Sequence, residues 1–222
     1  INEIVESFAE FARLLPGDGT LLIQHELPHR LAITAGLDCE VQTIGFAPQA
    51  DWCVQVTDGA GSTVPSTDFA AVIPPAEGAH RSGFMPVNLY YRDELVTEWC
   101  NPMAGEHMAY NAAAAAVMAH RLGASWPKIA EAIATFRGLD RRMELLGQRL
   151  VRQPHDKGGL VTIVDDYGHH PTEIDTTLRA LRRCYDPKRL VCVFQPHQHS
   201  RTRFLMEQFA ASFSQADLVI VP

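Results

Sequence analysis

The sequence has 222 residues, of which 46% are hydrophobic and 20% are charged, enough for one sizeable hydrophobic core or two modest ones. Its net charge of -7 disfavours a protein that binds nucleic acid through a broad positive surface. The longest apolar stretches, such as 112–119, are far shorter than the roughly 20 residues that a membrane span needs. We therefore expect neither nucleic-acid nor membrane partners.

Five cysteines form no C-x-x-C pair, and their odd number disfavours a disulfide framework or a zinc knuckle. A reducing, cytoplasmic setting fits them best. The sequence starts with Ile1 rather than Met and closes on an apolar run at 217–222 that resembles the start of a strand. These ends predict a piece of a longer enzyme.

The first 138 residues combine apolar runs of strand length with segments of helical spacing. We expect helices at 2–15, 105–122 and 126–136, and strands at 21–23, 42–46, 52–56, 69–73, 87–91 and 95–99. Ser125 is the expected N-cap of the third helix, with Pro127 in its first turn. Gly138 ends this helix and precedes a charged stretch, which we expect to be the domain boundary.

The second half alternates between strands and helices. We expect strands at 160–164, 190–194 and 218–221, with helices at 171–184 and 201–213 between them. Such a βαβαβ unit predicts an α/β fold with a parallel sheet covered on both faces. Because ligands bind beyond the carboxyl ends of strands in such sheets, those ends are the candidate sites.

The first of these strands leads into two carboxylates and two imidazoles, Asp165, Asp166, His169 and His170. Removing four ionisable groups from water is unfavourable without partners, so the cluster indicates function rather than solvated turn residues. Pro171 suits the first position of a helix, which puts His169 or His170 at a cap whose amides favour an anion.

The second strand leads into Ser200, Arg201 and Arg203. Ser200 can cap the next helix while the arginines supply charge for a carboxylate or a phosphate. A capped helix with two solvated arginines is an equally good interpretation.

Two further candidates lie outside these strands. His107 and Asn111 are four residues apart on one helix face, where they could contact the edge of a base or form an ordinary interface pair. Arg141 and Arg142 lie in the linker, where an arginine can reach a phosphate or simply stay solvated. No Gly-Lys dipeptide occurs, so the chain has no G-x-x-x-x-G-K-[ST] phosphate loop.

Four segments, in this order, resemble the Mur ligase family: PMAGEHMAYNAAAA at 102–115, FRGLDRRME at 136–144, DDYGHHPTEI at 165–174 and QPHQHSRTR at 195–203. The first two resemble Mur ligases in general, and the last two together resemble the members that add alanine. Many relatives carry an arginine where this sequence has Gln198.

The resemblance implies a three-domain enzyme. Residues 1–138 would be the C-terminal part of the central ATP-binding domain, and residues 139–222 the first part of a Rossmann-like, parallel-sheet ligase domain. The implied reaction is ATP-dependent and Mg²⁺-dependent ligation of L-alanine to the carboxylate of UDP-N-acetylmuramate through an acyl phosphate, in peptidoglycan precursor synthesis. Lacking the N-terminal domain and the phosphate loop, the chain alone is expected to be inactive.

The resemblance also implies roles for individual residues. Those implied for ATP are His107 and Asn111 at the adenine, Arg142 at the phosphates and Asp166 near the ribose. Those implied for the incoming alanine are Tyr167, His169, His197 and Arg201, with Arg201 pairing with its carboxylate. Among all of these, the expected catalytic residues are Arg142, Asp166 and His169.

Other functions stay open at this stage. A murein tripeptide recycling ligase resembles the third segment but differs at the fourth. A hydrolase could bind Zn²⁺ or Mn²⁺ through Asp165, Asp166, His169, His170, His197 and His199. A non-catalytic nucleotide-binding module would also fit the missing phosphate loop.

Overall fold

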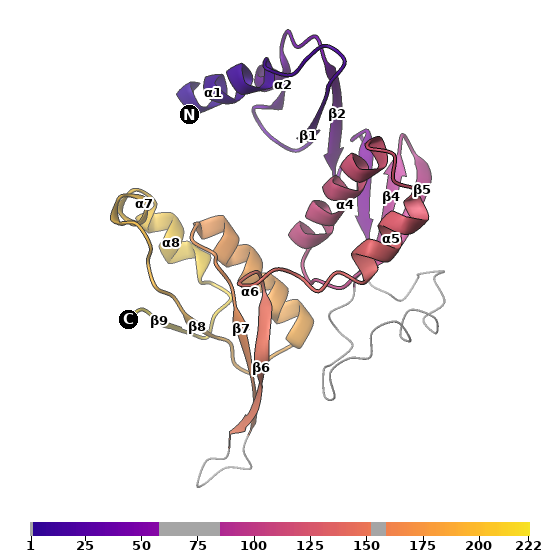
Figure 1. Cartoon of the computed structure of the whole chain (residues 1–222). Helices are drawn as coiled ribbons and strands as arrows, with labels where there is room; N and C mark the ends of the chain where they lie inside the picture. Colours follow the sequence, from indigo (N-terminus) through magenta and orange to yellow (C-terminus); the bar gives the residue numbers. More distant parts are fainter. Residues whose placement is uncertain (1, 58–84, 152–158) are drawn as a thin grey trace. The chain divides into compact units, whose positions relative to one another are not determined.

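The computed structural model describes residues 2–57, 85–151 and 159–222 (Figure 1). These residues fall into two compact units. The first comprises 2–57, 85–101 and 108–135, and the second comprises 102–107, 136–151 and 159–222. The expected strand at 69–73 lies outside the described residues. No helix in the described ranges is long and apolar enough to cross a membrane.

The first unit is built on a five-stranded mixed sheet in the order β1-β2-β3-β4-β5. Its strands are β1 (Thr20–Gln24), β2 (Glu40–Gly45), β3 (Trp52–Val56), β4 (Met85–Tyr91) and β5 (Glu94–Asn101). The first three run parallel, while β4 and β5 join them antiparallel. The five strands predicted here outside 69–73 are therefore confirmed.

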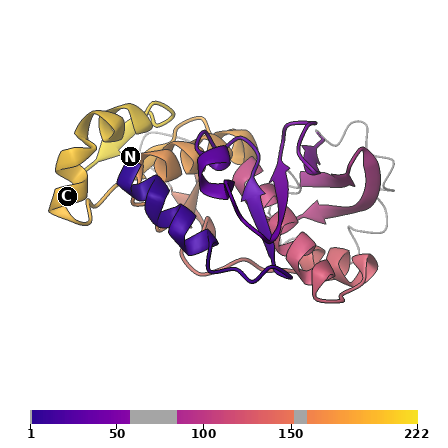
Figure 2. The same cartoon turned by 90° about the horizontal axis from the view of Figure 1, so that it is seen from above.

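Helices α1 (Asn2–Ala12), α2 (Arg30–Thr34), α4 (Glu106–Arg121) and α5 (Trp126–Ala134) complete this unit, apart from the first two residues of α4 (Figure 2). The alanines of α4 at 109, 113 and 116 are fully buried, because small side chains let the helix approach the sheet closely. They pack with Val87, Leu89 and Trp99 in the main core. Ser125 is the N-cap of α5 as predicted, although its side chain makes no capping hydrogen bond.

The second unit contains two strand pairs. Strands β6 (Glu144–Val151) and β7 (Gly159–Asp165) pair antiparallel, and β8 (Val191–Val193) and β9 (Leu218–Ile220) pair parallel. The α/β class is confirmed, but the arrangement differs from the predicted parallel sheet, since β7 pairs with β6 and not with β8. The sequence prediction missed β6, because charged residues precede it and Glu144 begins it.

The helices of the second unit are α6 (Pro171–Tyr185), α7 (His199–Phe204) and α8 (Met206–Ser212). Ile174 and Leu178 of α6 and Phe209 of α8 form its core with Phe194. Strand β7 keeps exposed apolar side chains such as Leu160, so the expected cover on both faces is wrong for the described residues. The predicted single helix at 201–213 is also wrong, because Leu205 leaves helical geometry and separates α7 from α8.

Candidate active site

The residues between β7 and α6 form a short turn at the carboxyl end of a strand. The apolar strand ends at Asp165, and Pro171 begins the helix, where its fixed φ and missing N–H suit the first turn. Residues 166–170 are therefore held between two regular elements. The turn lies where ligands commonly bind in α/β sheets.

A capping box fixes the start of α6. His170 is the N-cap, and its Nδ1 accepts a hydrogen bond from the Thr172 amide at 3.3 Å. Glu173 Oε2 accepts from the His169 amide at 2.9 Å and from the His170 amide at 3.2 Å. The predicted cap is confirmed, but these amides already bond to the protein's own side chains. The sequence interpretation of them as an anion site is therefore not supported.

Asp166 joins the turn to the linker. Its Oδ2 accepts from the Met143 amide at 2.9 Å, and its Oδ1 accepts from the Gly168 amide at 2.8 Å. Both carboxylate oxygens thus hold backbone, as a short polar side chain at a turn commonly does. Met143 has a φ of 49°, a left-handed conformation that the bond to Asp166 helps to fix.

Arg141 provides a second tie between the linker and the turn. The Arg141 carbonyl accepts from the Tyr167 amide at 2.7 Å. Its guanidinium stacks over the Tyr167 ring at 4.6 Å from the centroid, and its Nε lies 3.5 Å from Asp165 Oδ2. Cation–π contacts and exposed ion pairs are each weak, so it is their combination with the backbone bond that orders this edge.

Glu173 connects Arg142 to His169. Its Oε1 lies 3.9 Å from Arg142 Nη1, and its Oε2 lies 3.6 Å from His169 Nδ1. Burial alone would raise the pKa of the Glu173 carboxyl, but the His169 and His170 amides, the His169 ring and the Arg142 cation outweigh it. They hold the pKa below its ordinary value, so the carboxylate is charged at neutral pH.

The hydrogen bond of His169 indicates its tautomer. Nδ1 lies 3.0 Å from the Tyr167 carbonyl oxygen, which can only accept, so Nδ1 carries the proton. In the neutral ring, Nε2 is then an unprotonated acceptor. Tyr167 and His169 also meet edge to face, with ring centroids 5.2 Å apart.

His107 holds a buried polar atom without a partner. Its Nδ1 has no hydrogen bond among the described residues. Burial lowers the pKa of His107; the Asp166 carboxylate opposes this and the Arg142 cation adds to it. A neutral imidazole nitrogen without a partner fits a ligand that supplies the missing hydrogen bond. Asn111 follows one turn later on α4 and is exposed.

The other predicted substrate contacts lie around α7. His197 and Arg201 make no side-chain hydrogen bond or ion pair within the described ranges. The N-cap of α7 is Gln198, with a φ of 78°, and Ser200 lies inside the helix, so the expected Ser200 cap is wrong. The structure thus gathers His107, Arg142, Asp166, Tyr167 and His169 and leaves these two without such contacts.

The ligands expected for a metal-dependent hydrolase do not assemble. No group of three or more His, Cys, Asp or Glu side chains in the described part of the chain could hold a metal ion. The carboxylate of Asp166 binds two amides, and Nδ1 of His170 caps α6. This geometry gives the hydrolase alternative no support.

Arg142 also borders a cavity of about 450 Å³ in the second unit. Its lining combines linker residues next to Arg142 with Met103, Glu144, Gln148 and Tyr185. Since its nearest carboxylate is 3.9 Å away and the cavity is open beside it, the guanidinium has room to change rotamer and meet an anion.

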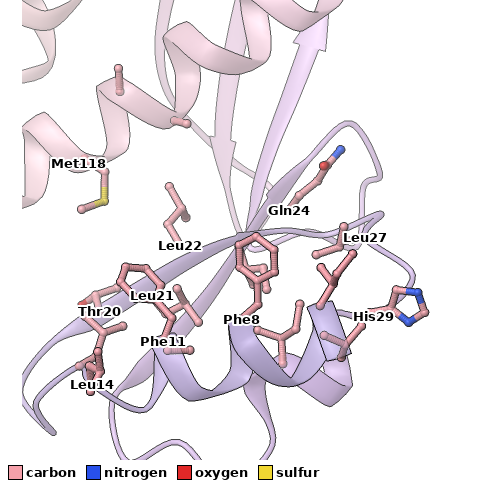
Figure 3. Close-up of a pocket in the computed structure, with 18 residues that line it drawn as sticks. Phe8, Phe11, Leu14, Thr20, Leu21, Leu22, Gln24, Leu27, His29 and Met118 are labelled. Atoms are coloured by element: carbon pink, nitrogen blue, oxygen red, sulfur yellow. The ribbon is translucent and has the colours of Figure 1, made fainter. Parts of the chain in front are cut away.

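A second, apolar cavity of about 880 Å³ lies in the first unit (Figure 3). Phe8 and Phe11 of α1 line it together with Leu14, Leu21 and Met118. No predicted site residue borders it, so this cavity is not part of the candidate active site.

Sequence reasoning missed Glu173 as a member of the site, and it named Arg141 as a linker candidate without its contacts to the turn. The signal for Glu173 was present, because a Glu three residues after an N-cap is the mark of a capping box. Arg141 was named as a linker arginine, but its contacts with Asp165 and Tyr167 depend on the hairpin of β6 and β7.

Comparisons with known proteins bear on this site. The model of the family "Mur ligase, glutamate ligase domain" matches residues 141–221. A UDP-N-acetylmuramate–L-alanine ligase of Caldanaerobacter subterraneus subsp. tengcongensis is 33% identical over 221 residues, covering 100% of this chain and 42% of that protein. One from Endomicrobium trichonymphae is 40% identical over 134 residues, covering 60% of this chain and 28% of that protein. The chain therefore spans less than half the length of these relatives.

Solved structures share the fold. The UDP-N-acetylmuramate–alanine ligase MurC of Thermotoga maritima matches with a TM-score of 0.63 at 20% identity, covering 98% of this chain and 40% of that one. A murein peptide ligase of Psychrobacter arcticus matches with a TM-score of 0.63 at 21% identity, covering 99% and 40%. The family model and the sequence relatives confirm the expected resemblance, and the solved structures show the shared fold.

Proposed function

Residues 141–221 belong to the Mur ligase family, and from that premise we propose that the polypeptide carrying this chain ligates L-alanine to the carboxylate of UDP-N-acetylmuramate, using ATP. The observation that carries the proposal is the set of contacts around the turn between β7 and α6: Asp166 bonds to the Met143 amide, and Glu173 lies 3.9 Å from Arg142 and 3.6 Å from His169. A cation can stabilise developing negative charge and an imidazole with a free acceptor can take up a proton, and acyl transfer to an amine uses both.

The nucleotide would be held by three residues. The buried Nδ1 of His107, which has no partner among the described residues, suits a hydrogen-bonding group of the adenine. Asn111, one turn along α4, would contact the same base. Arg142 would contact the phosphates, since its guanidinium has room to move and is only loosely paired with Glu173.

The first step transfers the γ-phosphoryl group of ATP to the muramate carboxylate, which gives an acyl phosphate and ADP. Arg142 would stabilise the negative charge that develops on the transferred group. Mg²⁺ supplies further charge neutralisation in such reactions. Within the described residues, no group of three or more His, Cys, Asp or Glu side chains could hold this ion.

In the second step the amine nitrogen of alanine attacks the acyl carbon, the bond from that carbon to the phosphate oxygen breaks, and inorganic phosphate leaves with the proton that the nitrogen loses on becoming an amide. The amine must first give up the proton of its ammonium form. Nε2 of His169 would accept this proton, because its Nδ1 is held as the donor to the Tyr167 carbonyl. Arg201 and His197 would contact the alanine, with Arg201 pairing with the carboxylate.

Asp166 would hold the backbone of the site in place. Its carboxylate fixes the Met143 and Gly168 amides, which holds the linker and the turn in one arrangement while Arg142 and His169 work. Residues 1–138 would then belong to a central ATP-binding domain and residues 139–222 to the ligase domain. The five free cysteines agree with a cytoplasmic protein.

A murein tripeptide recycling ligase is the second candidate, because a murein peptide ligase shares the fold with an equal TM-score. The names of the sequence relatives favour alanine. Phosphate release by the natural full-length polypeptide with ATP, Mg²⁺ and UDP-N-acetylmuramate separates the two. Release that requires L-alanine supports the proposal, release with the tripeptide alone supports the second candidate, and release with neither argues against both.

A further inference from the structure

Glu173 contacts more of the candidate site than a helix cap requires. One oxygen, Oε2, accepts from the His169 and His170 amides and so completes the capping box. The same oxygen lies 3.6 Å from His169 Nδ1, and Oε1 lies 3.9 Å from Arg142 Nη1. The capping function uses Oε2 alone, whereas the full carboxylate spans two of the expected catalytic residues.

The charge of Glu173 is not needed for the cap. Glutamine serves as well as glutamate at this position of a capping box, since either side chain offers an oxygen acceptor. A negative charge matters, however, to a guanidinium and to an imidazole that becomes an imidazolium. The contacts to Arg142 and His169 thus give the carboxylate a role that the helix does not explain.

We propose that Glu173 is a positioning residue of the ligase site, whose carboxylate orients the His169 ring and holds Arg142 beside it. This inference rests on the proposed function. When Nε2 takes a proton from the alanine ammonium, the ring carries a positive charge, and its Nδ1–H then faces both the Tyr167 carbonyl and Oε2 of Glu173. Oε2 faces that Nδ1–H at 3.6 Å and keeps the same contact once the proton passes to water.

The charged groups around His169 come from three segments. Glu173 and His170 belong to the start of α6 or its cap, Asp166 belongs to the turn, and Arg142 comes from the linker. Asp166 is already occupied by two amides. Glu173 is therefore the carboxylate that the structure places against the His169 ring.

The test is Glu173→Gln in the natural full-length polypeptide, with Asp175→Asn as the matched control. Asp175 lies on the same helix and pairs with Arg179 at 2.8 Å, and its side chain forms no hydrogen bond or ion pair with a site residue in the described part of the chain. We expect Glu173→Gln to lower kcat about tenfold, with KM for alanine changed less than about twofold, because charge acts in the transition state. We expect Asp175→Asn to keep kcat. Both variants should stay folded, with only a small fall in Tm, because each loses a charged contact. A kcat for Glu173→Gln equal to that of the wild type would overturn the proposal.

A second measurement does not depend on the proposed function. Imidazole ¹⁵N NMR of the 222-residue chain reports which nitrogen of His169 carries the proton. We expect the Nδ1–H form in the wild type and in Asp175→Asn, and a smaller share of that form in Glu173→Gln. Unchanged ¹⁵N shifts in Glu173→Gln would contradict the positioning role even if the ligase activity were established. The expected change without ligase activity would retain the role and reject the reaction.

Discussion

Replacing Asp166 by alanine removes one acceptor that two backbone amides share. The two bonds, from Met143 at 2.9 Å and from Gly168 at 2.8 Å, both end on a charged carboxylate. Hydrogen bonds to charged groups contribute about 1.5–3 kcal/mol each, and because Asp166 is half-buried the lower end applies, which gives about 3 kcal/mol for the pair. Asp166→Asn keeps one acceptor oxygen and should lose about half of this.

Hydrogen exchange measures this loss at the two amides themselves. We expect exchange of the Met143 and Gly168 amides to become about 100-fold faster in Asp166→Ala, since 1.4 kcal/mol corresponds to a factor of ten. The control is Asp165→Ala, whose exposed carboxylate is 3.5 Å from Arg141 and should contribute less than about 1 kcal/mol. Equal exchange rates in Asp166→Ala and Asp165→Ala would refute the anchoring role.

Three further predictions concern the rest of the chain. Leu89 is fully buried at 0% exposure, so Leu89→Ala should lower the free energy of unfolding of the first unit by about 2–5 kcal/mol. Leu95 is 48% exposed, so Leu95→Ala should change that free energy by less than about 0.5 kcal/mol. Urea unfolding followed by tryptophan fluorescence measures both. Burial lowers the pKa of His107 in the folded state, so the unfolded chain takes up the proton first as the pH falls. The free energy of unfolding should therefore decrease as the pH drops below the ordinary pKa of 6.5. We expect the urea midpoints at pH 7.5 and pH 5 to differ more in the wild type than in His107→Asn. Arg182→Ala removes guanidinium hydrogen bonds to the Gln215 and Pro187 carbonyls and to the Asp217 carboxylate. Because the Leu190 amide donates to the same carboxylate, its hydrogen exchange should become about tenfold faster. An unchanged exchange rate would contradict this link between Arg182 and Leu190.

Periodicity predicted most elements of the chain. The strand at 52–56 and the alanine-rich helix were confirmed because their patterns reflect burial against one core. Strand β6 was missed, because its first residue is charged and because a local pattern does not show that it pairs with β7. The break between α7 and α8 at Leu205 was also not predicted. The apolar spacing continues through it, because Leu205 and Phe209 both pack on the core of α6.

The candidate site was predictable in its residue types and not in its contacts. The cluster of carboxylates and imidazoles after β7 was visible as a pattern, and the structure brings Asp166 and His169 together with Arg142. What the pattern could not show is that Asp166 binds backbone and that Glu173 faces both other residues. These contacts depend on the left-handed linker at Arg141 and Met143, which only the folded hairpin fixes.

The most direct test of the proposed ligase follows an oxygen atom. UDP-N-acetylmuramate labelled with ¹⁸O in its carboxylate is incubated with the natural full-length polypeptide, ATP, Mg²⁺ and L-alanine, and the inorganic phosphate is analysed by mass spectrometry. Attack of the amine on an acyl phosphate leaves one carboxylate oxygen on the phosphate, so each phosphate released should carry one ¹⁸O. Phosphate that forms with alanine present and carries no ¹⁸O would contradict the account.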